Sequence, residues 1–317
     1  MLSKDSQLSE YHSSSARSAA VTSMAVGAFG LVGSEFLPTS LLTTMAADLN
    51  DSEGAVGQAV TATAVPALIA SLLVTFLTRN LDRKNVIICF SLLLIILNVI
   101  VALSPSIWMV LAGRVFLGLA LGGFWTLSLA ITGRLVREEY TARALSIVMF
   151  GISAATVLAP PAGSFLGDLI GWRGVFLVSA CLGGLALVGQ IVALPRLPPQ
   201  GPSHLVVLVA VARRPGIAAA LVSVLLIFTG HFAFFTYIRP FLEMVTHLGG
   251  EGISTFLLGF GMATFAANYL GAYLFEKSMR PKLAAMPCTM GILALFLLEF
   301  GRSFIITGRL LTLWGSL

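Results

Sequence analysis

Two charged residues lie inside long apolar stretches, and their types and positions could carry a proton. Glu35 is the only charged residue in 29-FGLVGSEFLPTSLL-42, and Arg114 is the only one in 111-LAGRVFLGLALGGFW-125. Burial favours the neutral form of a carboxyl group, whereas a nearby guanidinium favours its ionised form. A change in the separation of the two side chains could therefore load and unload a proton at Glu35. The alternative is a permanent ion pair that only fixes the register of two helices.

The composition indicates which elements must position these two residues. Only 10% of the residues are charged, 57% are hydrophobic and the mean hydropathy is +0.95. Soluble domains carry about 25% charged residues. Apolar stretches of about twenty residues recur along the chain, which is typical of helices that cross a bilayer. We therefore predict an all-α polytopic membrane protein.

The apolar stretches predict nine full spans and the beginning of a tenth. They lie near residues 19–42, 58–78, 86–103, 107–133, 144–167, 174–194, 216–241, 253–275 and 283–300, and the tenth begins near 304. Most connections are short, but the segment 195–215 is rich in proline, which marks a linker. The chain thus divides into an N-terminal six-helix half (1–194), a cytoplasmic linker (195–215) and an incomplete C-terminal half (216–317).

The basic residues predict the orientation of the chain in the membrane. With the N-terminus in the cytoplasm, most of the 19 Lys and Arg residues fall on cytoplasmic segments, and only Arg173, Arg239 and Arg302 fall on the outer side. This bias is usual for helical membrane proteins, so we expect a multi-pass protein of the cell inner membrane. Because the basic residues are scattered over loops, the net charge of +5 does not indicate nucleic-acid binding.

Small residues follow one another at helical spacing in two of the predicted spans. The fifth span carries the ladder Gly151, Ala155, Ala159, Gly163 and Gly167, interrupted by Pro160 and Pro161, and the fourth carries Gly118 and Gly122 after Arg114. Such faces let another helix approach to backbone contact. They suit helices that slide or rock during a conformational cycle, but tight packing in a static bundle would use the same residues.

Three segments of the chain resemble motifs of the major facilitator superfamily. The stretch 111–125 resembles the fourth-span motif, and 159-APPAGSFLGDLIGWR-173 resembles the fifth-span motif of the proton-coupled antiporters in this family. The segment 78-TRNLDRKN-85 resembles the signature loop between spans two and three, although Thr78 and Asn85 stand where that motif prefers glycine. The resemblance implies a major facilitator fold, normally of twelve spans. It also implies gating roles for Asp82 and Arg83.

Within that family, the chain looks most like bacterial purine ribonucleoside efflux pumps. The similar segments are 35-EFLPTSLLTTMAADL-49, 57-GQAVTATA-64 and 234-FFTYIRPFLE-243. The resemblance implies a proton-coupled antiporter that exports purine ribonucleosides such as inosine, or purine analogues, by alternating access. A sugar or multidrug exporter of the same family is the alternative. The family fold places spans one and four together, and Glu35 and Arg114 both lie about 10 Å from the outer ends of their spans at ~1.5 Å per residue.

An aromatic face in the seventh predicted span could bind a purine. Phe228, Phe232, Phe235 and Arg239 fall on one side of the helix, beside His231. Bases stack on aromatic platforms of this kind, but aromatic side chains that face lipid give the same pattern. His231 could titrate near neutral pH or could simply hydrogen-bond a neighbouring helix.

Three further residues are candidates for the substrate pathway. Phe124 and Trp125 lie in the middle of the fourth predicted span, away from the usual interfacial belt of aromatic residues. Asn268 is a polar residue in the eighth predicted span, where it could line a pathway or join two helices.

Other classes of protein fit the sequence less well. The chain has no GxxxxGK[ST] loop for nucleotide phosphates and no HExxH or Cys/His cluster for a metal, so we expect no cofactor and no metal site. An intramembrane enzyme would need several converging catalytic groups, and a receptor would not require two buried charges of opposite sign. We therefore expect a transporter whose partners are a small-molecule substrate, protons and the lipid bilayer. We also expect the protein to be a monomer. Because the chain stops inside the tenth predicted span, we also consider a fragment or an inactive truncated product.

Overall fold

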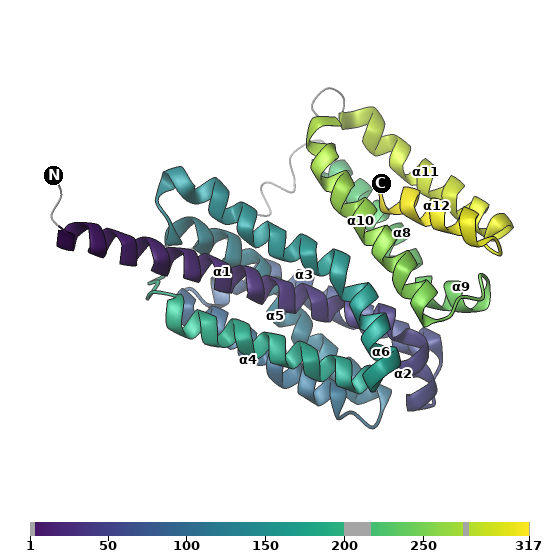
Figure 1. The fold of residues 1–317 in the computed structure, drawn as a ribbon, viewed down its shortest axis with the longest axis horizontal. Coiled ribbons are helices and arrows are strands. Elements are labelled where there is room, and N and C mark those ends of the chain that lie inside the picture. Colours follow the sequence, from purple (N-terminus) through teal and green to yellow (C-terminus); the bar gives the residue numbers. More distant parts are fainter. Residues whose placement is uncertain (1–3, 200–216, 275–278, 317) are drawn as a thin grey trace. The chain divides into compact units, whose positions relative to one another are not determined.

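The structure is a computed structural model in which the described part of the chain is helical and contains no strand. It describes the backbone of residues 4–199, 217–274 and 279–316, and side chains within 17–199, 217, 221–267 and 286–316. Figure 1 shows the order of the helices along the chain. Most of the predicted linker, from residue 200 onward, lies outside the described residues.

Twelve helical elements are described. They are α1 (Lys4–Ser40), α2 (Leu42–Leu49), α3 (Glu53–Leu77), α4 (Arg83–Ala102), α5 (Ile107–Leu135), the short 3-10 helix η1 (Glu138–Tyr140), α6 (Thr141–Ala193), α8 (Ile217–Thr236), α9 (Ile238–Met244), α10 (Gly250–Leu274), α11 (Met279–Phe300) and α12 (Phe304–Gly315).

Five of the described helical segments are long and apolar enough to cross a membrane, and a sixth is counted if α8 and α9 form one bent span. The five are Arg17–Ser40, Glu53–Leu77, Arg83–Ala102, Ile107–Leu135 and Glu138–Ala193, and α8 meets α9 at an angle of 42°. Two shorter apolar helices follow, Met286–Phe300 and Phe304–Gly315. The nine full spans expected from the sequence thus exceed the five or six that the described residues supply by this measure.

One long helical element contains a break that explains part of this difference. Residues Glu138–Ala193 count as a single segment of 56 residues, whereas about 20 residues suffice to cross the hydrocarbon core. Within it, Gly171 has φ 73° and ψ 160°, a backbone conformation that is open only to glycine at low cost. Gly171 lies between the stretches predicted as spans five and six.

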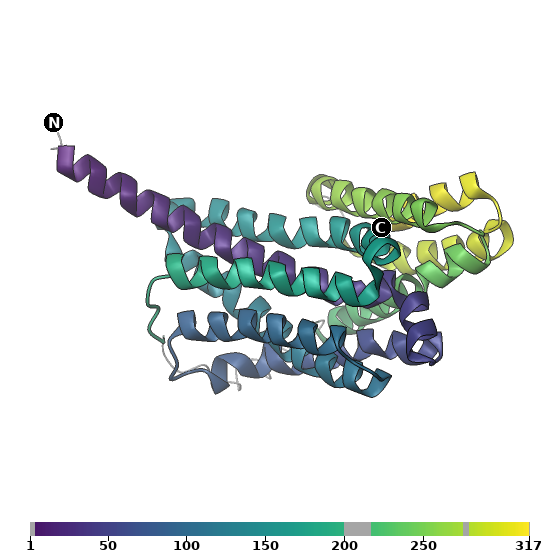
Figure 2. The same cartoon turned by 60° about the horizontal axis from the view of Figure 1, so that its bottom comes forward.

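The chain divides into two compact units, and the first gathers most of the N-terminal helices. It comprises residues 1–35, 58–155 and 173–203. Figures 1 and 2 show α1, α3, α4 and α5 running alongside one another, and α4 packs on α5. The unit also contains the beginning and the end of α6, residues 141–155 and 173–193. Asp82 caps the N-terminus of α4 by accepting a hydrogen bond from the amide of Lys84 at 2.9 Å.

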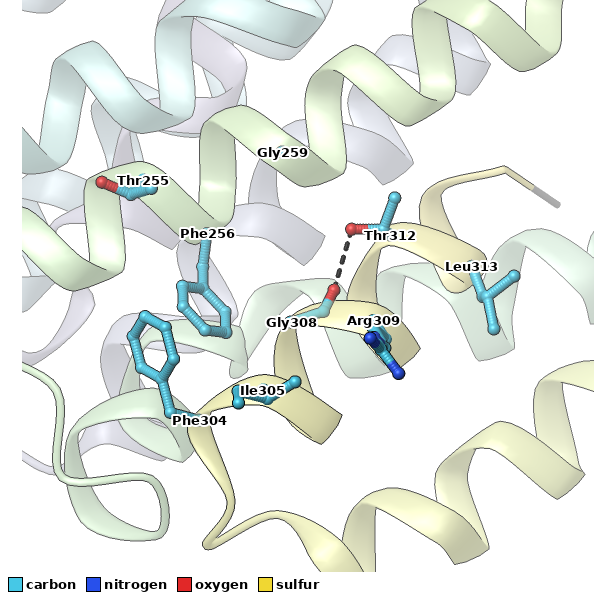
Figure 3. A pocket seen from close by; sticks show the side chains of 9 residues that line it. All are labelled: Thr255, Phe256, Gly259, Phe304, Ile305, Gly308, Arg309, Thr312 and Leu313. Carbon is cyan, nitrogen blue, oxygen red and sulfur yellow. Dashed lines mark hydrogen bonds between the residues drawn. The ribbon is translucent and has the colours of Figure 1, made fainter.

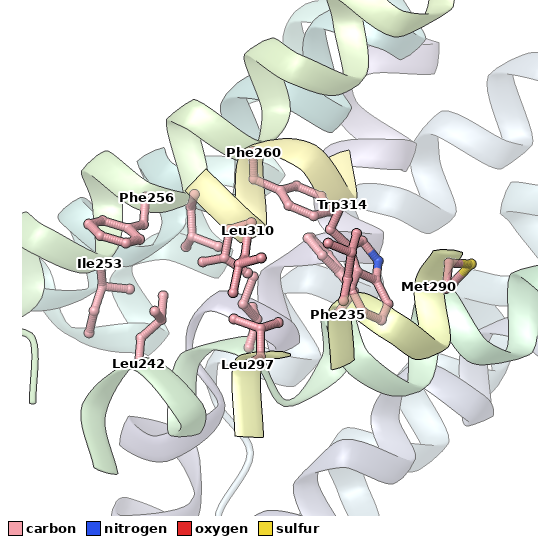
Figure 4. Close-up of a cluster of buried hydrophobic side chains, with 13 residues drawn as sticks. Phe235, Leu242, Ile253, Phe256, Phe260, Met290, Leu297, Leu310 and Trp314 are labelled. Carbon is pink, nitrogen blue, oxygen red and sulfur yellow. The ribbon is translucent and has the colours of Figure 1, made fainter. Parts of the chain in front are cut away.

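The second unit comprises residues 36–57, 156–172 and 204–317. Its apolar core is built where α8, α9, α10, α11 and α12 meet, and α10 packs on α12 (Figure 4). The core side chains include Phe235, Leu242, Phe256, Phe260 and Trp314, each at most 8% exposed. Phe234 stacks on Trp314 with ring centroids 4.2 Å apart. This core supports the aromatic face predicted in the seventh span.

Candidate functional site

Arg114 is buried against the end of α1, at a place where a proline leaves a backbone carbonyl without its helical partner. Pro38 lies inside α1, and because proline has no amide hydrogen, the carbonyl of Ser34 four residues earlier has no intrahelical donor. The guanidinium of Arg114 donates to this carbonyl at 2.8 Å and to the carbonyl of Glu35 at 2.9 Å. The arginine therefore satisfies a polar group that would otherwise be costly inside a membrane.

The sequence predicted that the side chains of Glu35 and Arg114 would pair, and the structure brings them together in a different way. Arg114 binds the main-chain carbonyl of Glu35, and within the described residues the Glu35 carboxylate has no hydrogen-bond or ion-pair partner. Arg114 is completely buried, and in the same described part of the chain its Nε atom has no hydrogen-bond partner. The carboxyl group thus lies next to a buried cation without being tied to it.

The turn of α1 before Glu35 is fixed by a second polar contact. The hydroxyl of Ser34 donates to the side-chain oxygen of Asn98 on α4 at 2.8 Å, and the Asn98 amide donates to the carbonyl of Leu94 at 2.7 Å. Ser34 and Asn98 are both buried. Ser34 is therefore held from α4 through its hydroxyl and from α5 through its carbonyl, which fixes the position of the neighbouring Glu35 backbone.

The aromatic face of the seventh predicted span forms part of a cluster in the second unit. The ring of His231 stacks on Phe235 with centroids 6.1 Å apart, and it lies 6.0 Å from Phe260 of α10. Phe36, which follows Glu35 in α1, lies 5.5 Å from Phe235 in an edge-to-face arrangement and 6.3 Å from Phe232. We call Phe36, His231, Phe232, Phe235 and Phe260 the aromatic cluster.

The other three candidates for the substrate pathway, Phe124, Trp125 and Asn268, differ in how deeply their side chains are buried and in whether the structure describes them. Phe124 is only 2% exposed and packs close to Gly27 of α1, where an added Cβ atom would come within 3.1 Å of its ring. Trp125 is half-buried. The side chain of Asn268 lies outside the described residues, although α10 includes its backbone. Packing in the first unit accounts for Phe124 without a ligand.

Gly118 and Gly122, in the fourth predicted span, bring α5 and α3 to backbone contact, as the sequence predicted for small residues at this spacing. A Cβ atom at Gly118 would lie 2.2 Å from the carbonyl oxygen of Thr63, and one at Gly122 would lie 1.9 Å from that of Ala67. Real Cβ atoms essentially never approach so closely. The two glycines, spaced by four residues, thus allow α5 to lie directly on the backbone of α3.

The small-residue ladder of the fifth span packs along α1. In the first unit, a Cβ atom at Gly151 would lie 2.5 Å from the carbonyl oxygen of Ala25. In the second unit, a Cβ atom at Gly163 would lie 2.5 Å from the hydroxyl of Ser40, and one at Gly167 would lie 2.4 Å from Leu41. The ladder predicted a close partner without identifying it, and that partner is α1.

Pro160 and Pro161 lie inside α6, where they remove two amide donors. The carbonyl of Val157, four residues before Pro161, therefore lacks its helical donor. Gly261 of α10 packs against the backbone of Val157, since a Cβ atom there would lie 2.9 Å from its carbonyl oxygen. The prolines and Gly261 thus mark a close contact between α6 and α10 within the second unit.

The predicted signature loop holds the chain that leaves α6. The carboxylate of Asp82 accepts a hydrogen bond from the amide of Leu197 at 3.0 Å, and the amide of Arg83 donates to the carbonyl of Leu197 at 2.9 Å. The guanidinium of Arg83 donates hydrogen bonds to the carbonyl and the hydroxyl of Thr78. Lys84 donates to the carbonyls of Ile191 and Leu194. Asp82 and Arg83 therefore anchor the segment that leads into the predicted linker.

The sequence placed Arg239 on the outer side of the membrane, and it did not identify the buried polar contacts that the side chain makes. Arg239 is 3% exposed. Its guanidinium pairs with Glu243 at 2.8 Å and with Asp168 at 3.3 Å. It also donates to the carbonyl of Ser40 and to the hydroxyls of Thr43 and Ser164. Asp168, the only acidic residue in 159–173, was the signal in the sequence that could have pointed to these contacts, because a charge in such an apolar stretch needs a partner.

An open cavity of about 680 Å³ lies between α10 and α12, away from these residues (Figure 3). Its lining is mainly apolar and includes Phe256 and Phe304, whose rings meet edge to face at 4.9 Å. Arg309 is the charged residue of the lining. None of the residues predicted to bind a proton or substrate lines this cavity, so we base no functional site on it.

Comparison with known proteins identifies the family and close relatives. Residues 24–316 match the family model described as Major Facilitator Superfamily. The chain is 41% identical over 297 residues to the purine ribonucleoside efflux pumps NepI of Shigella sonnei (strain Ss046) and Escherichia coli (strain K12). Each alignment covers 93% of this chain and 75% of the relative.

A solved structure shows the same fold at low sequence identity. The crystal structure of a bacterial homolog of the human lysosomal transporter Spinster, in an inward-facing and unoccupied conformation, matches with a TM-score of 0.78. The match covers 95% of this chain and 72% of the other, with 16% sequence identity. At this identity the similarity shows the fold alone.

Proposed function

Because the chain belongs to the Major Facilitator Superfamily and is therefore a membrane transporter rather than an enzyme, we propose that it exports purine ribonucleosides in exchange for protons. The observation that carries the proposed substrate is the 41% identity to purine ribonucleoside efflux pumps over 93% of the chain. Inosine and purine analogues are the compounds to test first. Sugar and multidrug export are the competing possibilities within the same family.

We place the protein in the cell inner membrane as a monomer with its N-terminus in the cytoplasm. The proposal retains nine full spans and the beginning of a tenth. Helices α1, α3, α4 and α5 supply the first four, the two parts of α6 supply the fifth and sixth, and α8 with α9 supplies the seventh. Residues 1–194 form the N-terminal six-helix half, residues 195–215 the cytoplasmic linker and residues 216–317 an incomplete C-terminal half. This orientation follows the distribution of basic residues.

In the proposed mechanism, Glu35 carries the coupling proton and Arg114 adjusts how tightly that proton is bound. Arg114 is held by two backbone carbonyls, so its positive charge stays close to Glu35 in this conformation. The carboxylate interacts electrostatically with Arg114 but makes no hydrogen bond or close ion pair within the described part of the chain, so it can bind a proton without first breaking such a contact. A movement that changes its distance from the guanidinium changes its proton affinity.

The aromatic cluster is the proposed purine-binding surface. It presents His231 and four phenylalanine rings from α1, α8 and α10. A purine ring stacks on such surfaces, while a polar neighbour such as His231 can bond the edge of the base. Phe36 follows Glu35 in the sequence, so a displacement of this turn of α1 moves both the proton carrier and an aromatic contact. Phe124, Trp125 and Asn268 remain secondary candidates.

The conformational cycle is alternating access, in which the two halves of the family fold rock about a central site. Gly118, Gly122 and Gly163 permit the close helix contacts along which such movements occur, while Pro160 and Pro161 interrupt the hydrogen bonding of α6. Asp82 and Arg83 hold the chain that enters the linker. We propose that these residues act in gating.

Inverted membrane vesicles that contain the complete protein test the proposed function. Acidification of the vesicle lumen should drive accumulation of radiolabelled inosine, because protons leave the lumen as the nucleoside enters it. Unlabelled guanosine and adenosine should compete, whereas a hexose and a cationic dye should not. Accumulation that is independent of the pH gradient would contradict antiport. Competition by the sugar or the dye alone would replace the purine substrate with one of the alternatives.

A further inference from the structure

The contacts of Arg239 join segments that lie far apart in the sequence. Its guanidinium reaches the end of α1 at Ser40, α2 at Thr43, and α6 at Ser164 and Asp168. All of these contacts lie within the second unit. Arg239 belongs to α9, in the C-terminal half of the chain, whereas its partners other than Glu243 belong to the N-terminal half. One side chain thus binds both halves of the transporter sequence together.

The polar contacts of Arg239 follow an aromatic contact. Phe36 of α1 meets Phe235 of α8 edge to face at 5.5 Å. Ser40 lies four residues after Phe36, one turn further along α1, and its carbonyl accepts a hydrogen bond from Arg239. Arg239 lies four residues after Phe235, but in α9, beyond the 42° bend between α8 and α9. The contacts of Arg239 thus come directly after the aromatic cluster, both along α1 and along the bent pair of α8 and α9.

The charges indicate that the contact is specific. Arg239 has a side chain that is 4% exposed, and it faces two carboxylates, Asp168 and Glu243, which are 39% and 27% exposed. Glu243 also accepts a hydrogen bond from the hydroxyl of Thr43 at 3.1 Å. A buried guanidinium is retained only where its donors find acceptors. Separation of these segments would leave the arginine without most of its partners, so the buried charge favours the arrangement in which the segments stay together.

Two glycines make room for side chains of the network. A Cβ atom at Gly163 would meet the hydroxyl of Ser40 at 2.5 Å, and one at Gly250, at the start of α10, would meet the Asp168 carboxylate at 1.8 Å. The lack of a side chain at both positions thus lets α6 and α10 approach these polar contacts closely.

We propose that Arg239, Asp168 and Glu243 form a latch that closes the aromatic cluster from one side of the membrane, the outer side in the proposed orientation. Arg239 is a positioning residue for transport: it holds Phe36 against Phe235 while the latch is closed, and it releases both when the latch opens for discharge of substrate. The role of the latch in substrate discharge rests on the proposed function, whereas its closing of the aromatic cluster does not.

Cysteine accessibility tests the latch without substrate or a proton gradient. Ser40→Cys is nearly isosteric and retains the carbonyl that Arg239 binds, and Ser40 is only 1% exposed. The variant is made in an otherwise cysteine-free background, and a membrane-impermeant maleimide is added to intact cells. We expect slow labelling with the latch intact. Arg239→Gln should raise the labelling rate by ~5-fold or more, the usual lower range of coupling between two sites.

Asp168→Asn and Glu243→Gln each remove one charge from the latch and should give smaller increases. Arg302→Gln is the matched control, because Arg302 is exposed at the turn between α11 and α12 and should leave labelling unchanged. Size-exclusion chromatography of each variant verifies folding, and the two carboxylate variants decide the result if Arg239→Gln does not fold.

Unchanged labelling in every folded latch variant would overturn the latch. Faster labelling together with no inosine transport in the parent protein would keep the latch and reject the proposed substrate. In a transporting protein, the latch also predicts that Arg239→Lys changes the maximal transport rate more than the KM for inosine. A residue with only a structural role would lower the amount of folded protein without changing the accessibility of residue 40 in the fraction that folds.

Discussion

Arg114 donates a hydrogen bond of 2.9 Å to the main-chain carbonyl of Glu35, whereas the carboxylate of Glu35 makes no hydrogen bond or close ion pair within the described residues and interacts with Arg114 only electrostatically. The cation and the acid are therefore neighbours that do not form a direct salt bridge. A direct buried pair would have to be broken before the acid could take up a proton, at considerable cost. The observed arrangement keeps the positive charge in place while the carboxyl group remains available.

Replacement of the proton carrier should abolish coupling and retain binding. We expect Glu35→Gln to reduce inosine accumulation driven by an acidic vesicle lumen at least about tenfold, within the range of typical coupling free energies. Exchange of inosine between equilibrated compartments should persist, since it needs no net proton movement. Glu251→Gln is the control, because Glu251 is exposed in the first turn of α10. Gradient-driven accumulation by Glu35→Gln at the parent rate would exclude Glu35 as the carrier.

Replacement of Arg114 should destabilise the protein as well as change coupling. Arg114→Ala leaves the carbonyl of Ser34 without a donor, and an unsatisfied buried polar group costs about 1–3 kcal/mol. The melting temperature of the purified protein in detergent should therefore fall clearly. Arg302→Ala removes an exposed charge and should change it little. An unaltered melting temperature for Arg114→Ala would show that the two carbonyl contacts contribute nothing to stability.

The contact between α3 and α5 should tolerate no added methyl group. Gly122→Ala places a Cβ atom 1.9 Å from the carbonyl oxygen of Ala67, and overpacking of this kind typically costs about 1–3 kcal/mol. Gly184→Ala is a matched control, since a Cβ atom there has no neighbour within 4 Å. We expect a lower melting temperature and slower transport only for Gly122→Ala. Equal stability of the two variants would mean that α3 and α5 do not pack as described.

Removal of a ring from the aromatic cluster should weaken substrate binding more than it slows transport. Stacking of a base on an aromatic side chain is worth about 1–3 kcal/mol, so Phe235→Ala should raise the Kd for inosine by ~5-fold to 150-fold at 1.4 kcal/mol per tenfold change. Isothermal titration of the purified protein measures this change. Phe165→Ala removes an exposed ring and should leave the Kd unaltered. If both variants bind as the parent does, inosine does not stack on the cluster.

The helical nature of the chain could be predicted because apolar residues far outnumber charged ones over stretches of membrane-spanning length. The sequence also separated the fifth and sixth predicted spans between residues 167 and 174, and the non-helical backbone of Gly171 lies in that interval. It did not predict that Asp82 caps α4. The count of spans was less secure. Two spans can follow one another with only a kink between them, as the two parts of α6 do at Gly171, and a span can bend, as α8 and α9 do by 42°.

The partners within the candidate site could be predicted only in part. Sequence spacing predicted that Glu35 and Arg114 have similar depths in the membrane and that glycines permit close helix contacts. It could not show that Arg114 binds carbonyls, because that depends on the rotation of two helices about their axes. For the same reason the partners of Arg239 were missed: Ser40 and Asp168 precede it by 199 and 71 positions, and no periodicity relates them.

The contact between Arg114 and the carbonyl of Ser34 has a consequence for protein engineering. Pro38 leaves the carbonyl of Ser34 without a helical donor, and Arg114 supplies that donor, so the choice of residue at position 38 affects the role of position 114. Pro38→Ala, a common choice for strengthening a helix, would supply an amide that competes with Arg114 for the same oxygen. A substitution chosen only to strengthen α1 would thus displace Arg114 from its position beside Glu35. The two positions should be varied together, with a neutral residue at 114 whenever the proline is removed.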